Sequence, residues 1–154
     1  MSSAAALPRQ LPTETRYVMG HLITRYPSTG NFDLMMIQTP PGQDGPPPHF
    51  HQDFSESFVV VSGIAEFLVE DQRMKRRAGE HLDVPPRTVH AFRNASAVEP
   101  LVMFNVYSPK GFGEFVEQIG ILASEPHADR ESACGERMRR FLATAAEYDI
   151  FLAI

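Results

Sequence analysis

Frequent prolines and glycines divide this sequence into short segments. The chain can therefore form only folds built from short strands or helices. Thirteen prolines and ten glycines are spread over 154 residues, with one dense cluster in PPGQDGPPP and a pair at Pro85 and Pro86. The segments between them are rich in β-branched and aromatic residues. Because proline cannot donate a hydrogen bond within a central strand ladder, this pattern is typical of a small all-β domain.

Alternating apolar and polar residues predict the individual strands. Two strands are expected at about 17–25 and 32–38, and the proline-rich segment 40–48 should run extended after them. A hairpin then turns at Ser62 and Gly63. The later strands are expected in RMKRR, HLDV, VHAFRN and PLVMFNVYS. The basic side chains of RMKRR would lie on a solvated sheet edge, where charge opposes aggregation.

The period of the apolar residues changes after Pro109. One helical face is formed by Phe112, Phe115, Val116 and Ile119, with Gly120 as a stop signal. We favour packing of this helix on the side of the barrel over a lid role. A second helix is expected over roughly 131–147, with an apolar stripe of Met138, Phe141, Leu142, Ala145 and Tyr148.

These patterns predict one β-rich domain, a barrel or a sandwich, with a short helical tail. We expect a flexible arm at 1–16, a barrel at 17–108 and a helical extension at 109–154.

Composition narrows the function classes. A net charge of −5 argues against a nucleic-acid partner, which requires a concentrated cationic surface. The sequence contains no apolar leader and no spanning segment, so no membrane partner is expected. A single cysteine, Cys134, permits no intrachain disulfide, and we expect a cytoplasmic protein.

A cluster of metal-binding residue types stands at the entrance to the SFVVV strand. Residues two apart in a strand share a face, so His49 and His51 would point together into the barrel. Glu56 follows, and a buried carboxylate requires a cation or hydrogen bonds. His90 is available as a fourth group. His21 and His81 fit no ligand position and are expected to be structural or surface residues.

Two stretches resemble the motifs of the cupin family. GPPPHFHQDFSESFVVVSG resembles the first motif, G(X)5HXH(X)3,4E(X)6G, through His49, His51, Glu56 and Gly63. GEHLDVPPRTVHAFRN resembles the second, G(X)5PXG(X)2H(X)3N, through Gly79, Pro85, His90 and Asn94. Two positions depart from the motifs. Gln43 stands where the first glycine is expected, and Arg87 replaces a glycine, so that turn cannot use glycine's freedom at positive φ.

The resemblance implies a single jelly-roll barrel, a double-stranded β-helix, that holds one divalent transition metal. The ligands would be His49, His51, Glu56 and His90, and imidazole ligands leave Fe, Mn, Ni, Cu and Zn open. If Glu56 and His90 face inward, so do Phe58, Val60 and Phe92, which we expect to line a substrate pocket. Cupin domains commonly form homodimers, which we expect here as well.

The chain is most similar to small single-domain cupins of the quercetin 2,3-dioxygenase-like type, which share a tail with an AAxY stretch, here AAEYDI. This resemblance implies a dioxygenase acting on a small aromatic or enolisable substrate, with Glu56 also serving as general base. Two alternatives stay open. One is a non-oxidative isomerase, cyclase or lyase that uses the same metal, and the other is a cupin that binds a small ligand without catalysis.

Overall fold

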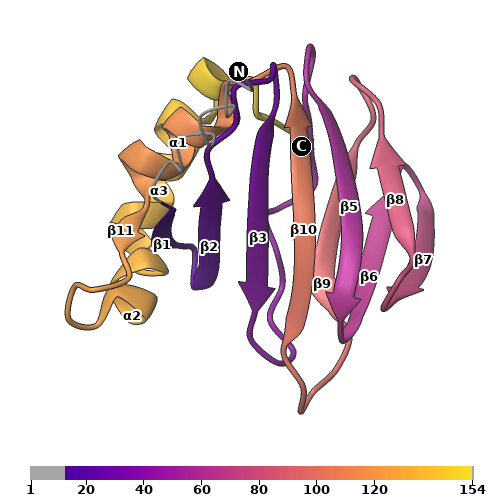
Figure 1. The fold of residues 1–154 in the computed structure, drawn as a ribbon, viewed down its shortest axis with the longest axis horizontal. Helices are drawn as coiled ribbons and strands as arrows, with labels where there is room; N and C mark the ends of the chain where they lie inside the picture. Colours follow the sequence, from indigo (N-terminus) through magenta and orange to yellow (C-terminus); the bar gives the residue numbers. More distant parts are fainter. Residues whose placement is uncertain (1–12, 154) are drawn as a thin grey trace, which may run out of the picture.

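Two antiparallel sheets face each other in the computed structural model, which describes residues 13–153 (Figure 1). The larger sheet has the order β11 (Ile121–Leu122), β1 (Glu14–Val18), β2 (His21–Tyr26), β3 (Asp33–Thr39), β10 (Leu101–Ser108), β5 (Ser55–Ser62) and β8 (His81–Val84). The smaller sheet has the order β12 (Phe151–Leu152), β4 (His49–Phe50), β9 (His90–Asn94), β6 (Ile64–Val69) and β7 (Gln72–Arg77). This arrangement confirms the predicted all-β jelly roll.

The core lies between the two sheets and follows from strict alternation in the central strands. Every second residue of β3 and β10 is buried, and the two strands pair in register with Met103 opposite Ile37. From the facing strands β5 and β6, Phe58 and Phe67 meet with ring centroids 5.0 Å apart. Because side chains alternate across a strand, the inward row of β10 also carries two polar residues, Asn105 and Tyr107, into this core.

The helices gather at one end of the larger sheet, beyond β1 and β2 (Figure 1). They are α1 (Phe112–Ile119), α2 (Ala128–Ser132), α3 (Gly135–Thr144) and the 3-10 helix η1 (Ala145–Tyr148). The four apolar residues predicted for the first helical face are all buried, and α1 ends directly before Gly120 as expected. None of the helices within residues 13–153 has the length and apolar character needed to cross a membrane.

The single strand expected at 17–25 is wrong, because the chain turns within it. Met19 and Gly20 both have positive φ, 53° and 82°, and they connect β1 to β2 as a two-residue hairpin in which Val18 pairs with His21. Positive φ at both positions is the geometry of the tight turns that fit a right-handed strand twist. β1 also begins inside the arm expected at 1–16, of which residues 1–12 lie outside the described chain.

The single helix expected over 131–147 is also wrong. The chain leaves helical geometry at Cys134, which has a ψ of 156° and caps α3 instead of lying within a helix. Phe141 and Ala145 are buried as expected, whereas Leu142 is 46% exposed. After η1 the chain forms β12 on the smaller sheet, so the C-terminal extension contains strand as well as helix.

Two sequence expectations about irregular and charged segments are confirmed. RMKRR lies in β7 at the edge of the smaller sheet, and Arg73, Lys75 and Arg77 are exposed. The proline-rich segment joins β3 to β4 without adding a strand, apart from one isolated bridge between Asp44 and Arg93.

The turn between β5 and β6 depends on the absence of a side chain at Gly63. This residue has a φ of +83°, and a Cβ built on it would lie 2.6 Å from the carbonyl oxygen of Pro100. Gly79 has nearly the same φ, +85°, with nothing within 4 Å. We therefore expect Gly63→Ala to lower the free energy of unfolding by at least about 1 kcal/mol more than Gly79→Ala, because overpacking adds to the left-handed strain.

Urea unfolding of the two variants tests this expectation. The Gly79→Ala variant is the matched control for backbone strain alone. Equal losses of stability would show that the Pro100 carbonyl yields freely and that close packing at Gly63 is not what fixes the turn.

Candidate metal centre

The two histidines of the first motif are placed by a short strand held between two neighbours. His49 lies in β4, where it pairs with His90 of β9 on one side and Leu152 of β12 on the other. His51 follows directly after β4. Both imidazoles are buried, as predicted from their spacing. Their ring centroids are 5.1 Å apart.

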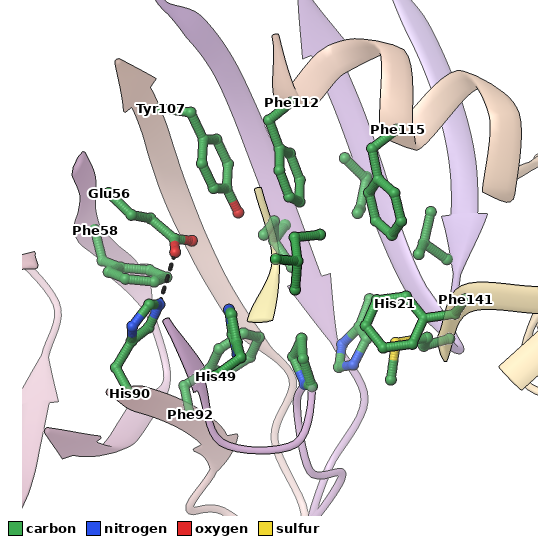
Figure 2. A pocket seen from close by; sticks show the side chains of 16 residues that line it. His21, His49, Glu56, Phe58, His90, Phe92, Tyr107, Phe112, Phe115 and Phe141 are labelled. Atoms are coloured by element: carbon green, nitrogen blue, oxygen red, sulfur yellow. Dashed lines mark hydrogen bonds and ion pairs between the residues drawn. The ribbon is translucent and has the colours of Figure 1, made fainter. Parts of the chain in front are cut away.

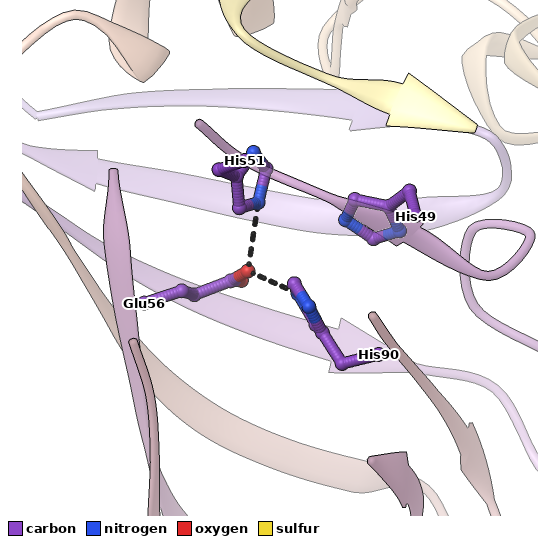
Figure 3. Close-up of side chains that lie close together, drawn as sticks. All are labelled: His49, His51, Glu56 and His90. Atoms are coloured by element: carbon purple, nitrogen blue, oxygen red, sulfur yellow. Dashed lines mark hydrogen bonds and ion pairs between the residues drawn. The ribbon is translucent and has the colours of Figure 1, made fainter. Parts of the chain in front are cut away.

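Glu56 and His90 complete the cluster from two other strands, β5 and β9 (Figure 3). One ligand atom from each of the four residues can be chosen so that all four atoms lie within 4.8 Å of one another. Glu56 Oε2 lies 2.9 Å from His90 Nε2 and 3.3 Å from His51 Nε2. The structure therefore brings together all four side chains that the sequence proposed as ligands.

Backbone carbonyl groups fix the tautomer of each imidazole. Nδ1 of His49 donates to the Pro47 oxygen at 2.9 Å, that of His51 to the Asp149 oxygen at 2.8 Å, and that of His90 to the Thr88 oxygen at 3.0 Å. A carbonyl can only accept, so each neutral ring carries its proton on Nδ1 and leaves a lone pair on Nε2. Metal-binding histidines are oriented in this way by outer-shell acceptors.

These lone pairs provide a test of whether a metal fits. The Nε2 atoms of His51 and His90 both face the carboxylate oxygen of Glu56, and acceptor-to-acceptor contacts in a buried site are unfavourable unless a cation lies among them. A proton on one Nε2 atom can relieve a single contact of this kind. A divalent cation would interact favourably with all four groups at once. Three imidazoles and one carboxylate suit a transition metal. The residues present therefore fit a divalent metal site.

Asn105 supports Glu56 from the neighbouring strand β10. Its Nδ2 donates to Glu56 Oε1 at 2.8 Å, which leaves Oε2 for the centre of the cluster. Asn105 Oδ1 is buried and has no partner among the described residues. Sequence reasoning missed this residue, although an asparagine in the buried row of PLVMFNVYS was a usable signal.

Electrostatics in the metal-free cluster favour an ionised carboxylate. Burial alone would raise the pKa of Glu56, but the hydrogen bonds and positive charge that His51 and His90 supply when a proton occupies Nε2 outweigh it and hold that pKa well below its usual range. For His90, burial lowers the pKa, whereas Glu56 and the Thr88 carbonyl together bring it above the ordinary value. Burial and the charge of His90 lower the pKa of His49 to about 4.

Tyr107 lies opposite Glu56 on the adjacent strand and was also missed by the sequence reasoning. Burial, together with the charge of Glu56, raises the pKa of Tyr107 well above its ordinary value, so its hydroxyl stays protonated. Its ring stacks on Phe112 with centroids 3.9 Å apart. Tyr107 therefore connects the cluster to helix α1.

A cavity extends from the cluster toward the helices (Figure 2). Glu56, His49 and His90 lie at one end, and His21, Phe115 and Phe141 at the other. Its free volume is about 50 Å³. Within the described chain no lysine or arginine lines it, and most of the lining is apolar or aromatic. A ligand here would meet the cluster at one end and hydrocarbon along its length.

The expected substrate residues divide between the cavity and the core. Phe58 and Phe92 line the cavity, whereas Val60 is buried without being one of its lining residues. Phe112 and Phe115 also line it, so α1 covers the cavity as well as packing on the sheet. The packing expected of this helix is present, and its position also agrees with the lid role left open.

His21 lines the far end of the cavity, a role the sequence did not suggest. It is buried, as expected for a structural residue, and its Nδ1 lies 3.0 Å from Thr39 Oγ1. Gln43, the departure from the first motif, donates from Nε2 to the Met19 carbonyl at 2.8 Å and lies 3.4 Å from His21 Nε2. Gln43 thus contacts two residues that line the cavity, Met19 and His21.

Arg87 overturns the expectation drawn from the second motif. The turn keeps the left-handed geometry in spite of the missing glycine, with an Arg87 φ of 67°. The Arg87 N–H donates to the His51 carbonyl at 2.6 Å. A contact with the ligand segment therefore holds a conformation that is costly for a residue with a Cβ.

Comparison with known proteins agrees with the geometry. The Cupin_2 family, described as a cupin domain, matches residues 35–107. Those residues contain both motifs and all four candidate ligands. Residues 35–107 form a cupin domain. The match begins later than the barrel expected at 17–108.

Three curated relatives resemble this cupin. An uncharacterised protein of Aquifex aeolicus is 30% identical over 67 residues, 44% of this chain and 54% of the relative. The 1-hydroxy-2-naphthoate 1,2-dioxygenase of Nocardioides sp. is 26% identical over 107 residues, 69% and 26% of the two chains. Quercetin 2,3-dioxygenase of Bacillus subtilis is 26% identical over 144 residues, which are 88% of this chain and 41% of the relative. The cupin thus spans about half the length, or less, of each relative.

Solved structures show the same fold. An RmlC-like cupin from Shewanella frigidimarina superposes with a TM-score of 0.57 and 18% identity, covering 71% of this chain and 96% of its own.

If the cluster binds metal, the metal content of the protein should depend on His49 and His51. We expect protein purified without an affinity tag to carry close to one equivalent of a divalent transition metal, and His49→Ala/His51→Ala to lose it. Removing two ligands should cost more affinity than the roughly 10- to 100-fold typical of outer-shell changes. Elemental analysis measures the content, with exposed His81→Ala as control. Equal metal in the double variant would contradict the assignment.

We expect the protonation of His21 to lower the free energy of unfolding at acid pH, independently of the metal ligands. Burial, only partly offset by a backbone hydrogen bond at Asp44, lowers the pKa of His21 from 6.5 to about 4. The unfolded chain therefore binds the proton first, so this stability is complete above about pH 6.5 and is lost as the pH falls toward 4. Between pH 7 and pH 5 the loss through His21 should be about 2 kcal/mol.

Urea unfolding at the two pH values, with His21→Gln beside exposed His81→Gln, measures this contribution. The His21 variant should show the smaller loss of stability on acidification. The same pH dependence in both variants would mean that His21 does not titrate as its burial requires.

Proposed function

We propose that this cupin is a metal-dependent dioxygenase whose substrate is a small, uncharged aromatic or enolisable compound coordinated to the metal. The observation that carries the proposal is the buried cluster of three histidines and one glutamate at the end of an aromatic cavity. Two of the curated relatives named above are dioxygenases, which supports oxygen chemistry over other uses of the same ligands.

Glu56 is the residue we assign to proton transfer. A divalent metal held by the cluster would lower the pKa of a coordinated substrate hydroxyl and supply redox chemistry with O2. The Glu56 carboxylate is ionised and Asn105 fixes one of its oxygens, so the other is positioned to accept the hydroxyl proton. Tyr107 keeps its own proton and can donate a hydrogen bond beside Glu56.

The lining residues and the volume of the cavity restrict the charge and the size of the proposed substrate. A carboxylate or phosphate that lies away from the metal would be buried without a lysine or arginine partner among the lining residues, which costs free energy. The free volume of about 50 Å³ favours a small compound over a large one. Phe58, Phe92 and Phe112 exclude further water. The proposed substrate is therefore compact and neutral.

Oxygen uptake tests the proposal. We expect protein loaded with Fe, Mn, Ni or Cu to consume one O2 per molecule of a small neutral 1,3-diketone or phenol. Anionic compounds such as 1-hydroxy-2-naphthoate or a sugar phosphate should react at least about 10-fold more slowly, since an unpaired buried carboxylate costs 1.4 kcal/mol or more. The metal-depleted His49→Ala/His51→Ala protein is the control.

The same assay separates the alternatives. Turnover that continues without O2 would replace the dioxygenase by an isomerase, cyclase or lyase that uses the same ligands. Tight binding of the neutral compounds without turnover in either condition would leave a ligand-binding cupin. Faster reaction of the anionic compounds would contradict the substrate class drawn from the cavity.

The expected homodimer and the cytoplasmic location stay predictions. The outer face of β5 supports an association between copies, because Val59 and Val61 are 43% and 45% exposed there.

A further inference from the structure

The C-terminal segment returns to the ligand segment from almost a hundred residues away. We propose that Asp149 is a positioning residue of the metal centre, which fixes the segment 51–54 with its carboxylate and the imidazole of His51 with its carbonyl group. The inference rests on the proposed metal site and adds to it a device outside the matched cupin domain, which ends at residue 107.

The Asp149 carboxylate accepts three consecutive backbone N–H groups. Oδ1 accepts from Gln52 at 2.8 Å, and Oδ2 accepts from Asp53 at 2.9 Å and from Phe54 at 3.0 Å. These residues form the bend between His51 and β5, which carries Glu56. Hydrogen bonds to a charged acceptor are stronger than neutral ones. One side chain therefore fixes the connection between two ligands.

The carbonyl group of the same residue fixes the ring of His51. His51 Nδ1 donates to the Asp149 oxygen at 2.8 Å, and no other acceptor for this atom is found within the described chain. The acceptors for His49 and His90 instead lie two residues before each ligand, on Pro47 and Thr88. His51 thus depends on a distant segment for its tautomer, whereas the other two histidines are oriented locally.

Strand pairing continues the same attachment beyond Asp149. In β12, Phe151 pairs with Phe50 and Leu152 with His49, and the rings of Phe50 and Phe151 stack with centroids 5.4 Å apart. The Ala153 N–H donates to the Pro48 carbonyl at 2.9 Å. The segment 149–153 therefore contacts the whole ligand segment from Pro48 to Phe54.

The backbone of Asp149 is adapted to this role. It caps η1 in the left-handed region with a φ of 61°, a conformation that aspartate tolerates better than most residues. Ile150, the next residue, is buried and lines the cavity. The turn thus directs one residue to the ligand segment and the next to the cavity.

Co²⁺ binding to the full chain tests the proposal without relying on activity. Asp149→Gly removes the carboxylate but keeps the carbonyl group and accepts the positive φ. We expect its Co²⁺ affinity to fall about 10- to 100-fold, as for other outer-shell partners. The visible absorption bands of bound Co²⁺ should also shift, because looser positioning of His51 and Glu56 changes the ligand geometry. Asp149→Asn, which keeps one acceptor oxygen, should lie between this variant and the natural protein.

Glu147→Gly is the matched control, since it removes an exposed carboxylate from the same helical turn. Its affinity and spectrum should equal those of the natural protein. An unaltered Co²⁺ spectrum and affinity in Asp149→Gly would overturn the positioning role. If Asp149→Gly does not fold, unaltered binding by folded Asp149→Asn overturns it instead. Absence of Co²⁺ binding by the natural protein would reject the metal site itself, which is a different result.

Discussion

A carboxylate buried among three histidines sets the main constraint on this structure. Glu56 is only 4% exposed, and a charge removed from water must be met by a cation or by hydrogen bonds. The surrounding protein meets this need on one side, where Asn105 donates to the carboxylate, whereas imidazole nitrogens face it on the other side. The three carbonyl groups that hold Nδ1 decide that those nitrogens present lone pairs. The cluster could therefore hold a divalent cation, which would meet the carboxylate and the lone pairs together.

The barrel serves this cluster by joining segments that are far apart in sequence. The candidate ligands come from β4 and the residue after it, from β5 and from β9. β10 supplies Asn105 and Tyr107, and the C-terminal segment supplies Asp149. Helix α1 and the tail close the cavity over them, and Tyr107 stacked on Phe112 links the two parts. The candidate metal ligands, the cavity and the helical tail therefore belong to one site.

The sequence allowed prediction of the parts that depend on local pattern. Alternation located most of the strands, and the two motifs located His49, His51, Glu56 and His90. The pattern failed where the decisive interaction is non-local. No local signal marks Asp149, since an aspartate after a helix predicts only a cap. Gln43 and Arg87 were identified as departures, but their contacts with Met19 and His51 depend on how distant segments meet.

Conformation at single residues explains the remaining errors. The hairpin at Met19 and Gly20 divides an apolar run that reads as one strand, because a two-residue turn need not interrupt the pattern. The break at Cys134 likewise lies within a stripe that suits a continuous helix. In both cases a glycine at the break, Gly20 or Gly135, was a local signal that the apolar pattern obscured.

X-ray absorption spectroscopy of the metal-loaded protein tests the central claim most directly. The account predicts one metal with three imidazole nitrogens and at least one carboxylate oxygen in its first shell, and loss of one imidazole in His90→Ala. A first shell without imidazole, or one unchanged in that variant, would show that the metal binds elsewhere and would contradict the assignment of this cluster.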